Sequence, residues 1–155
     1  MENKSKYSAS DIACFFINLA NKKVIDEENL TEGITNLKLQ KLLYFAQAAH
    51  CAIFHKPLFS EQILAWQYGP VVEEVYQEYK KYRNLPIPKP NDEKEIDQET
   101  QFFLENIWNI FGKYSTAELV NISHSHKPWM DAYQNKTKNI AINVLEEYYK
   151  NYFIA

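Results

Sequence analysis

The chain has 155 residues, enough for one ordinary domain with a sizeable core. Its composition is 46% hydrophobic and 15% aromatic, which excludes a disordered chain, and its 3 glycines are too few for the many tight turns of a sandwich or barrel. The formal net charge is −3 and Arg83 is the sole arginine among 17 basic residues, so a nucleic acid is not the expected main ligand.

The first predicted helix runs to about Val24. Ser8 or Ser10 is expected to cap its start, and Asp11 is favourable in its first turn. An acidic connector follows at Asp26–Glu32. These features predict an amphipathic helix that packs one face against the core.

The second predicted helix, Thr35–Phe54, is apolar on nearly all sides. A helix of this kind is surrounded by other elements. A membrane span is the alternative, but the cleaner apolar run Leu42–Phe54 is shorter than the ~20 residues that a bilayer requires and contains Gln47 and His50. We therefore expect a mainly α-helical, single compact domain over residues 1–155, with six to seven helices around this central buried helix and no membrane association.

The segment that follows the central helix is ambiguous. Alternation over Glu61–Tyr68 allows a short strand, and a β-hairpin near 62–68 and 84–88 is an open alternative. Gly69-Pro70 is expected to start a helix that ends near Arg83. A helix–strand–helix of this kind would resemble part of a winged helix, which keeps a nucleic-acid-binding regulator as the alternative function.

Three further helices are predicted in the C-terminal half. The first carries an apolar face over Phe102–Phe111. The second begins with the S-x-x-E capping-box pattern at Ser115–Glu118 and stops before Pro128. The last covers about Ile142–Tyr152, so the chain is predicted to end in a helix rich in tyrosine.

Few residues could act in catalysis, and their spacing does not match a known catalytic or metal-binding motif. His124 and His126 lie two apart, so on one helix they point to nearly opposite faces and cannot hold one metal ion. Ser123 or Cys51 could be paired with a histidine as a nucleophile, but the local sequence of neither residue resembles a nucleophile elbow. Neighbouring acids such as Glu73 diverge around their helix, and no glycine-rich phosphate loop occurs. We expect neither an enzyme nor a bound cofactor or metal, with a metal-dependent hydrolase as a distant alternative.

Cys14 and Cys51 each lie in an apolar helical run, which predicts buried, reduced thiols. The N-terminus lacks the pattern of a signal peptide. We therefore expect the protein in a reducing cytoplasm.

Several motifs, in this order and spacing, resemble those of the Panacea-domain proteins, also called SocA-like antitoxins or phage-associated proteins. The similarity extends over nearly the whole chain. Its residues are Thr35–Ala46, Pro57–Phe59, Trp66, Tyr68–Val71, Val75-Tyr76, Tyr114-Ser115, Ala117–Leu119, His124, Pro128-Trp129, Ile140 and Tyr148-Tyr149.

The resemblance implies a helical antitoxin encoded beside a toxin in bacteria or prophages. Such a domain neutralises its toxin by binding it, and in one lineage delivers it to a cellular protease. The resemblance does not imply an enzyme, and the toxins of the family are diverse.

The motif residues divide into an expected scaffold and an expected contact surface. The scaffold positions are Leu39, Leu42, Leu43, Phe45, Gly69, Pro70, Ser115, Glu118 and His124. Aromatic side chains are enriched at the centres of protein–protein contacts. The expected partner-binding residues are Tyr68, Trp129, Tyr148, Tyr152 and Phe153.

Overall fold

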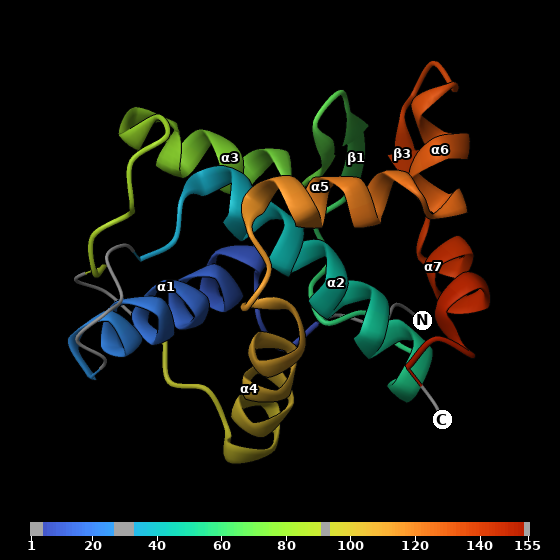
Figure 1. The fold of residues 1–155 in the computed structure, drawn as a ribbon. Helices are drawn as coiled ribbons and strands as arrows, with labels where there is room; N and C mark the ends of the chain where they lie inside the picture. Colours follow the sequence, from blue (N-terminus) through green and yellow to red (C-terminus); the bar gives the residue numbers. More distant parts are fainter. Residues whose placement is uncertain (1–4, 27–32, 91–93, 154–155) are drawn as a thin grey trace.

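The computed structural model describes residues 5–26, 33–90 and 94–153 (Figure 1). Within these ranges the chain forms seven α-helices, one short 3-10 helix and three short strands, so the predicted mainly helical class is confirmed. No helix there is both long and apolar enough to cross a lipid bilayer. The predicted connector Asp26–Glu32 lies outside the described residues except for Asp26, which is the last residue of α1. In chain order the elements are α1 Ala9–Asp26, α2 Asn36–Phe54, β1 Ile63–Trp66, β2 Gly69–Val71, α3 Glu73–Tyr79, η1 Lys80–Tyr82, α4 Gln98–Phe111, α5 Thr116–His124, α6 Lys127–Tyr133, β3 Asn139–Ile140 and α7 Ile142–Tyr149.

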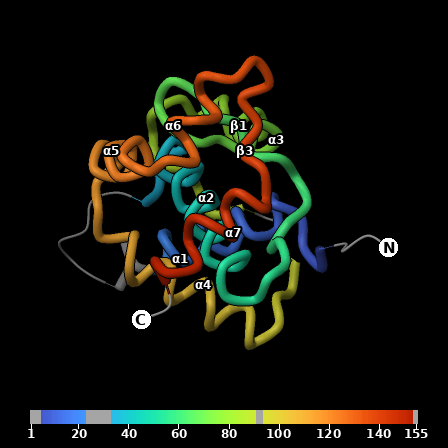
Figure 2. The backbone as a smooth tube through the Cα atoms, turned by 90° about the vertical axis from the view of Figure 1, so that its right-hand side faces the viewer, coloured from blue at the N-terminus to red at the C-terminus, as the bar shows by residue number. Residues whose placement is uncertain are grey.

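Helix α2 runs through the centre of the molecule, as the sequence predicts. Figures 1 and 2 show it surrounded by α1, α4, α5, α7 and the hairpin. The scaffold residues Leu39, Leu42, Leu43 and Phe45 are completely buried. Phe45 stacks on Phe111 of α4 at a ring-centroid distance of 4.3 Å, so α2 and α4 share one aromatic core.

Polar side chains of α2 hold the segment that follows it. Gln47 is completely buried, and its Nε2 donates to the carbonyl oxygen of Phe59 at 2.7 Å. Its Oε1 accepts from the backbone N–H groups of Leu58 at 2.7 Å and Phe59 at 3.3 Å. These bonds satisfy backbone groups that would otherwise be buried without a partner.

A second set of buried amides fixes the start of α3. Gln40 Oε1 accepts from the N–H of Val72 at 2.9 Å, and its Nε2 donates to Asn36 Oδ1 at 2.9 Å. Asn36 Nδ2 in turn donates to the carbonyl oxygen of Tyr76 at 3.0 Å. The buried amide side chains that interrupt the apolar pattern of α2 therefore form structural hydrogen bonds to the surrounding chain.

Side-chain caps set the helix ends. Thr35 caps α2 by accepting from the Lys38 N–H at 3.3 Å. In the predicted capping box of α5, the Ser115 N–H donates to Glu118 Oε1 at 2.8 Å and the Glu118 N–H donates to Ser115 Oγ at 3.1 Å. Each such cap contributes about 0.5–2 kcal/mol.

The strands form a small antiparallel sheet in the order β2-β1-β3. Strand β1 pairs with β2 through Trp66 and Gly69, and with β3 through Ile63 and Ile140. The short hairpin therefore exists, but its second strand is 69–71 and not 84–88. The third strand comes from far along the chain, which local alternation cannot reveal.

Two helix boundaries also differ from the predictions. Gly69-Pro70 does not start a helix. Gly69 has φ +109, which is not a helical conformation, and both residues belong to the buried strand β2; α3 begins only at Glu73. The segment Glu61–Arg83 is thus a hairpin followed by a helix, and not the expected helix–strand–helix. Pro128 was predicted to mark the end of α5. It lies in the first turn of α6, a helix that was not predicted.

Candidate partner-binding surface

The five predicted contact residues fall into two groups. Tyr68 lies in the turn between β1 and β2, and Trp129 lies on α6 behind that turn. Tyr148, Tyr152 and Phe153 lie at the C-terminal end, on or just beyond α7. Helix α6 contacts both β1 and α7, and Figure 1 shows it between the hairpin and α7, so it links the two groups.

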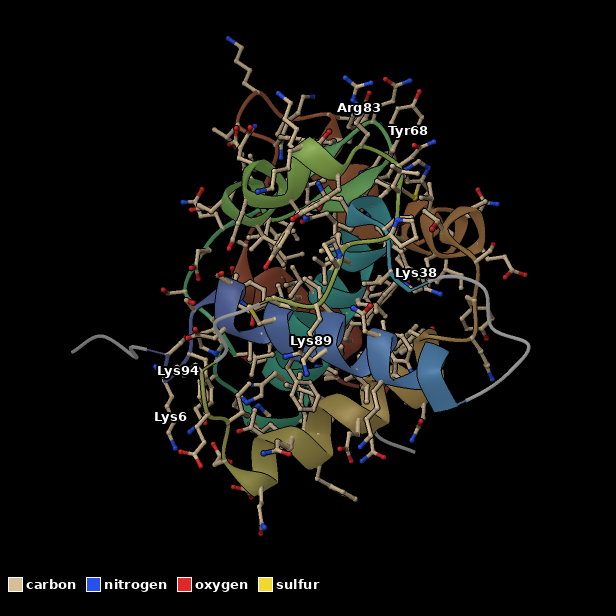
Figure 3. The ribbon with its side chains drawn as sticks, turned by 90° about the vertical axis from the view of Figure 1, so that its left-hand side faces the viewer. Lys6, Lys38, Tyr68, Arg83, Lys89 and Lys94 are labelled. Carbon is tan, nitrogen blue, oxygen red and sulfur yellow. The ribbon has the colours of Figure 1, made fainter. Side chains whose placement is uncertain are left out.

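The turn Gln67–Pro70, called the Tyr68 turn below, presents one large side chain. Tyr68 is 62% exposed. Figure 3 shows it at the outer edge of the molecule. An aromatic side chain presented in this way is available for contact with another protein.

Trp129 supports the Tyr68 turn from behind. Its ring stacks between His124 at 3.8 Å and Tyr133 at 4.8 Å, and its Nε1 donates to the carbonyl oxygen of Trp66 at 2.9 Å. The indole is only half-buried. It therefore joins α5, α6 and the hairpin while keeping one part at the surface.

The C-terminal group surrounds His126. The His126 ring lies 5.5 Å from that of Tyr148 and 5.2 Å from that of Tyr152, whose exposed fractions are 38% and 49%. Phe153 is half-buried and packs edge-on to Phe111 at 6.1 Å. Tyr148 and Tyr152 are thus the surface members of this group, and Phe153 closes the core beneath them.

A buried hydrogen-bond chain anchors this group to α2. His126 Nδ1 lies 2.7 Å from Tyr149 Oη, and that oxygen lies 2.9 Å from Tyr44 Oη on α2. Burial lowers the pKa of His126 and raises the pKa of Tyr149 and Tyr44. All three rings are therefore held neutral at physiological pH, so this chain is a rigid support without charge.

A shallow groove adjoins Tyr148. It encloses about 320 Å³ between α6 and α7. Val144 is 41% exposed in it, and its rim carries the surface ion pairs Lys127–Asp131 at 3.3 Å and Lys150–Glu147 at 2.9 Å. Val144 was not predicted as a contact residue, although its i,i+4 spacing places it on the same face of α7 as Tyr148. The groove is lined by Lys127, Pro128, Asp131, Asn143, Val144, Glu147 and Tyr148.

A second hollow of about 480 Å³ lies between the N-terminal segment, the end of α2 and the start of α4. Asp97, one of two acids that line it with Glu99, accepts from Tyr7 Oη at 2.5 Å and from the Thr100 N–H at 2.8 Å while capping α4. These bonds hold the pKa of Asp97 well below its usual range, the Tyr7 bond having the largest effect. The Asp97 carboxylate therefore has a structural role as the cap of α4.

The remaining scaffold residues meet at a buried amine. Lys41 of α2 is completely buried, and its Nζ donates to the carbonyl oxygen of Pro70 at 3.0 Å. Burial lowers the pKa of His124, and the positive charge of Lys41 lowers it further. Gly69 is in contact with the Lys41 stem. Gly69, Pro70 and His124 were predicted scaffold residues, whereas Lys41 was not, because it interrupts the apolar pattern of α2 as an exposed polar residue would.

The residues considered above as metal ligands or nucleophiles are not arranged as a catalytic site in the described part of the chain. Within the ranges that the structure describes, no three His, Cys, Asp or Glu side chains are grouped so as to hold a metal ion. Cys14 and Cys51 are buried, as predicted. Burial raises the pKa of Cys51 to about 12, so its thiol is protonated and a poor nucleophile.

Comparison with known proteins gives two matches. The family model described as "Antitoxin SocA-like, Panacea domain" matches residues 39–130, from α2 to α6. "Antitoxin SocA" of Caulobacter vibrioides (strain NA1000 / CB15N) is 32% identical over 109 residues, which is 62% of this chain and 58% of that relative. The match thus spans less than two thirds of the relative's length. No solved structure matches the chain. Because the family model covers more than half of the residues, the chain belongs to the SocA-like antitoxin family with a Panacea domain.

Proposed function

We propose that this protein is the antitoxin of a toxin–antitoxin system and neutralises a cognate toxin, encoded nearby, by direct protein–protein binding. The observation that carries the proposal is the family match over residues 39–130. The protein acts without catalysis, in the cytoplasm, where the toxin would act. The related protein from Caulobacter vibrioides is itself named an antitoxin.

The toxin contacts the aromatic surface on both sides of α6. Tyr68, Tyr148 and Tyr152 are exposed by 38% or more, and each combines a large apolar ring with a polar hydroxyl. Side chains of this kind dominate the energetics of many interfaces. Val144 in the α6–α7 groove extends the apolar area next to Tyr148.

Trp129 and Phe153 complete this surface at its edge. Trp129 holds the carbonyl of Trp66 and so fixes the base of the Tyr68 turn. Phe153 packs against the core beside Tyr152, at a ring-centroid distance of 4.9 Å from it. Both residues preorganise the exposed tyrosines, which reduces the entropy lost on binding.

The toxin is neutralised either by occlusion of its active surface or by delivery to a cellular protease. The two routes differ in what happens to the toxin. Occlusion leaves its amount unchanged, whereas delivery lowers it.

Co-expression with the neighbouring open reading frame tests the proposal. We expect the neighbour alone to stop growth, co-expression to restore it, and the two proteins to purify together. Immunoblotting of the toxin separates occlusion from protease delivery. A neighbour that is harmless alone, or one that stays toxic when both proteins are made, would show that the proposal is wrong.

A further inference from the structure

Lys41 is a buried amine without an acidic partner. Its side chain is completely buried in the centre of α2. It forms no ion pair with a carboxylate in the described part of the chain. A buried ammonium is unfavourable unless it is paired, so such a group favours its neutral form.

The Tyr68 turn covers this amine. A Cβ atom added at Gly69 would lie 2.6 Å from Lys41 Cε and 3.2 Å from Ser123 Oγ, so the turn backbone lies directly on the lysine and on α5. The turn is bonded at both ends: the carbonyl of Trp66 accepts from Trp129, and the carbonyl of Pro70 accepts from Lys41. Tyr68 lies between these two bonds.

The groups that face the amine are few. The hairpin places the backbone of Gly69 and Pro70 against it. Helix α5 contributes the imidazole of His124, and the hydroxyl of Ser123 lies against Gly69 on the same side of the turn. Burial lowers the pKa of His124 below its ordinary 6.5, so at pH 7 and above this imidazole is neutral. Lys41 is thus a buried group beside the turn whose charge changes near pH 7.

We propose that Lys41 is a positioning residue for the Tyr68 turn: the turn stays closed over the neutral amine and opens when the amine takes up a proton. The protonated amine gains water only if the turn lifts, because the turn and α5 cover it. An effect of this motion on toxin binding rests on the proposed function, because Tyr68 is a proposed toxin contact. The motion itself is a property of the free protein.

Linkage gives the direction and size of the effect. Burial lowers the pKa of Lys41 from 10.5 to about 7 in the closed state, whereas the open state exposes an ordinary lysine. Between these two values the open state binds more protons than the closed state. The opening constant of the turn therefore falls about tenfold for each unit by which the pH rises above 7, and it becomes independent of pH below 7.

Hydrogen exchange at the Val72 amide measures this opening. That N–H is buried and donates to Gln40 Oε1 at 2.9 Å, so it exchanges only when the end of the hairpin lifts. The intrinsic exchange rate rises about tenfold per pH unit, which the falling opening constant offsets. We expect the observed rate at Val72 to be nearly constant between pH 7.5 and 9.5 in the wild-type protein.

The variant Lys41→Met keeps the length of the side chain and removes its charge. In this variant we expect the Val72 exchange rate to rise about tenfold per pH unit over the same range. The amide of Leu104, buried in α4, reports the unfolding of the core in the same molecule. Unfolding also exposes Lys41, so Val72 reports the turn only where it exchanges faster than Leu104. The proposal is overturned if the wild-type rate at Val72 rises about tenfold per pH unit, if Val72 exchanges no faster than Leu104, or if the Lys41→Met rate at Val72 is as insensitive to pH as the wild-type rate. Because toxin is absent, none of these results bears on toxin binding.

Discussion

Replacing Phe45 by alanine will lower the free energy of unfolding by about 3–5 kcal/mol. Phe45 is completely buried in α2, stacks on Phe111 at 4.3 Å and meets Tyr44 edge-on at 5.1 Å. The substitution removes the ring and leaves a cavity where α2 and α4 meet, which the surrounding helices can fill only in part. Urea unfolding followed by circular dichroism measures the loss.

Phe102→Ala is the matched control for this change. Phe102 lies on α4 and is 67% exposed. Its removal is expected to change the free energy of unfolding by less than about 0.5 kcal/mol. If the two phenylalanine variants were equally stable, α2 would not form the centre of the core.

Replacing Gln47 by leucine will destabilise the protein by about 2–5 kcal/mol, although leucine is the more hydrophobic residue. The reason is that the buried amide of Gln47 makes three hydrogen bonds to the backbone of Leu58 and Phe59. Leucine leaves these three backbone groups buried without partners. The urea midpoint of the variant measures the effect.

Gln77→Leu provides the comparison, because Gln77 is exposed on α3. We expect its stability to stay within about 0.5 kcal/mol of the wild-type value. A Gln47→Leu protein as stable as wild type would mean that water or a shifted backbone replaces the lost bonds.

Local signals predicted much of the fold. The apolar run of α2, the capping box at Ser115–Glu118 and the helical apolar face over Phe102–Phe111 involve residues close in sequence, and the structure agrees with them. The pairing of β1 with Ile140 depends on a distant contact, whereas Pro128 in the first turn of α6 is a local start signal that was read only as a stop. Periodicity carries no information about distant contacts.

The burial of Lys41 and Gln47 shows the same limit at single residues. Both interrupt an apolar pattern, and a pattern cannot distinguish a polar side chain that reaches water from one that bonds to buried backbone. Only the tertiary structure shows that their partners are Pro70 and Phe59.

The candidate surface was predicted only in outline. Three of the predicted partner-binding residues, Tyr68, Tyr148 and Tyr152, are exposed, and their role in binding stays a prediction. Trp129 and Phe153 are half-buried because distant elements, β1 and α4, pack against them. Their contribution to toxin binding stays a prediction.

We expect the purified toxin from the adjacent gene to bind at Tyr68, Tyr148 and Tyr152, and calorimetric titration measures this binding. We predict saturable binding to the wild-type protein and to the exposed control Phe102→Ala. Replacing the three tyrosines by alanine together should weaken binding by at least about 30-fold, since truncating a binding hot spot costs about 2 kcal/mol or more. Equal affinities for the wild-type and triple-variant proteins, at equal stability, would contradict the claim.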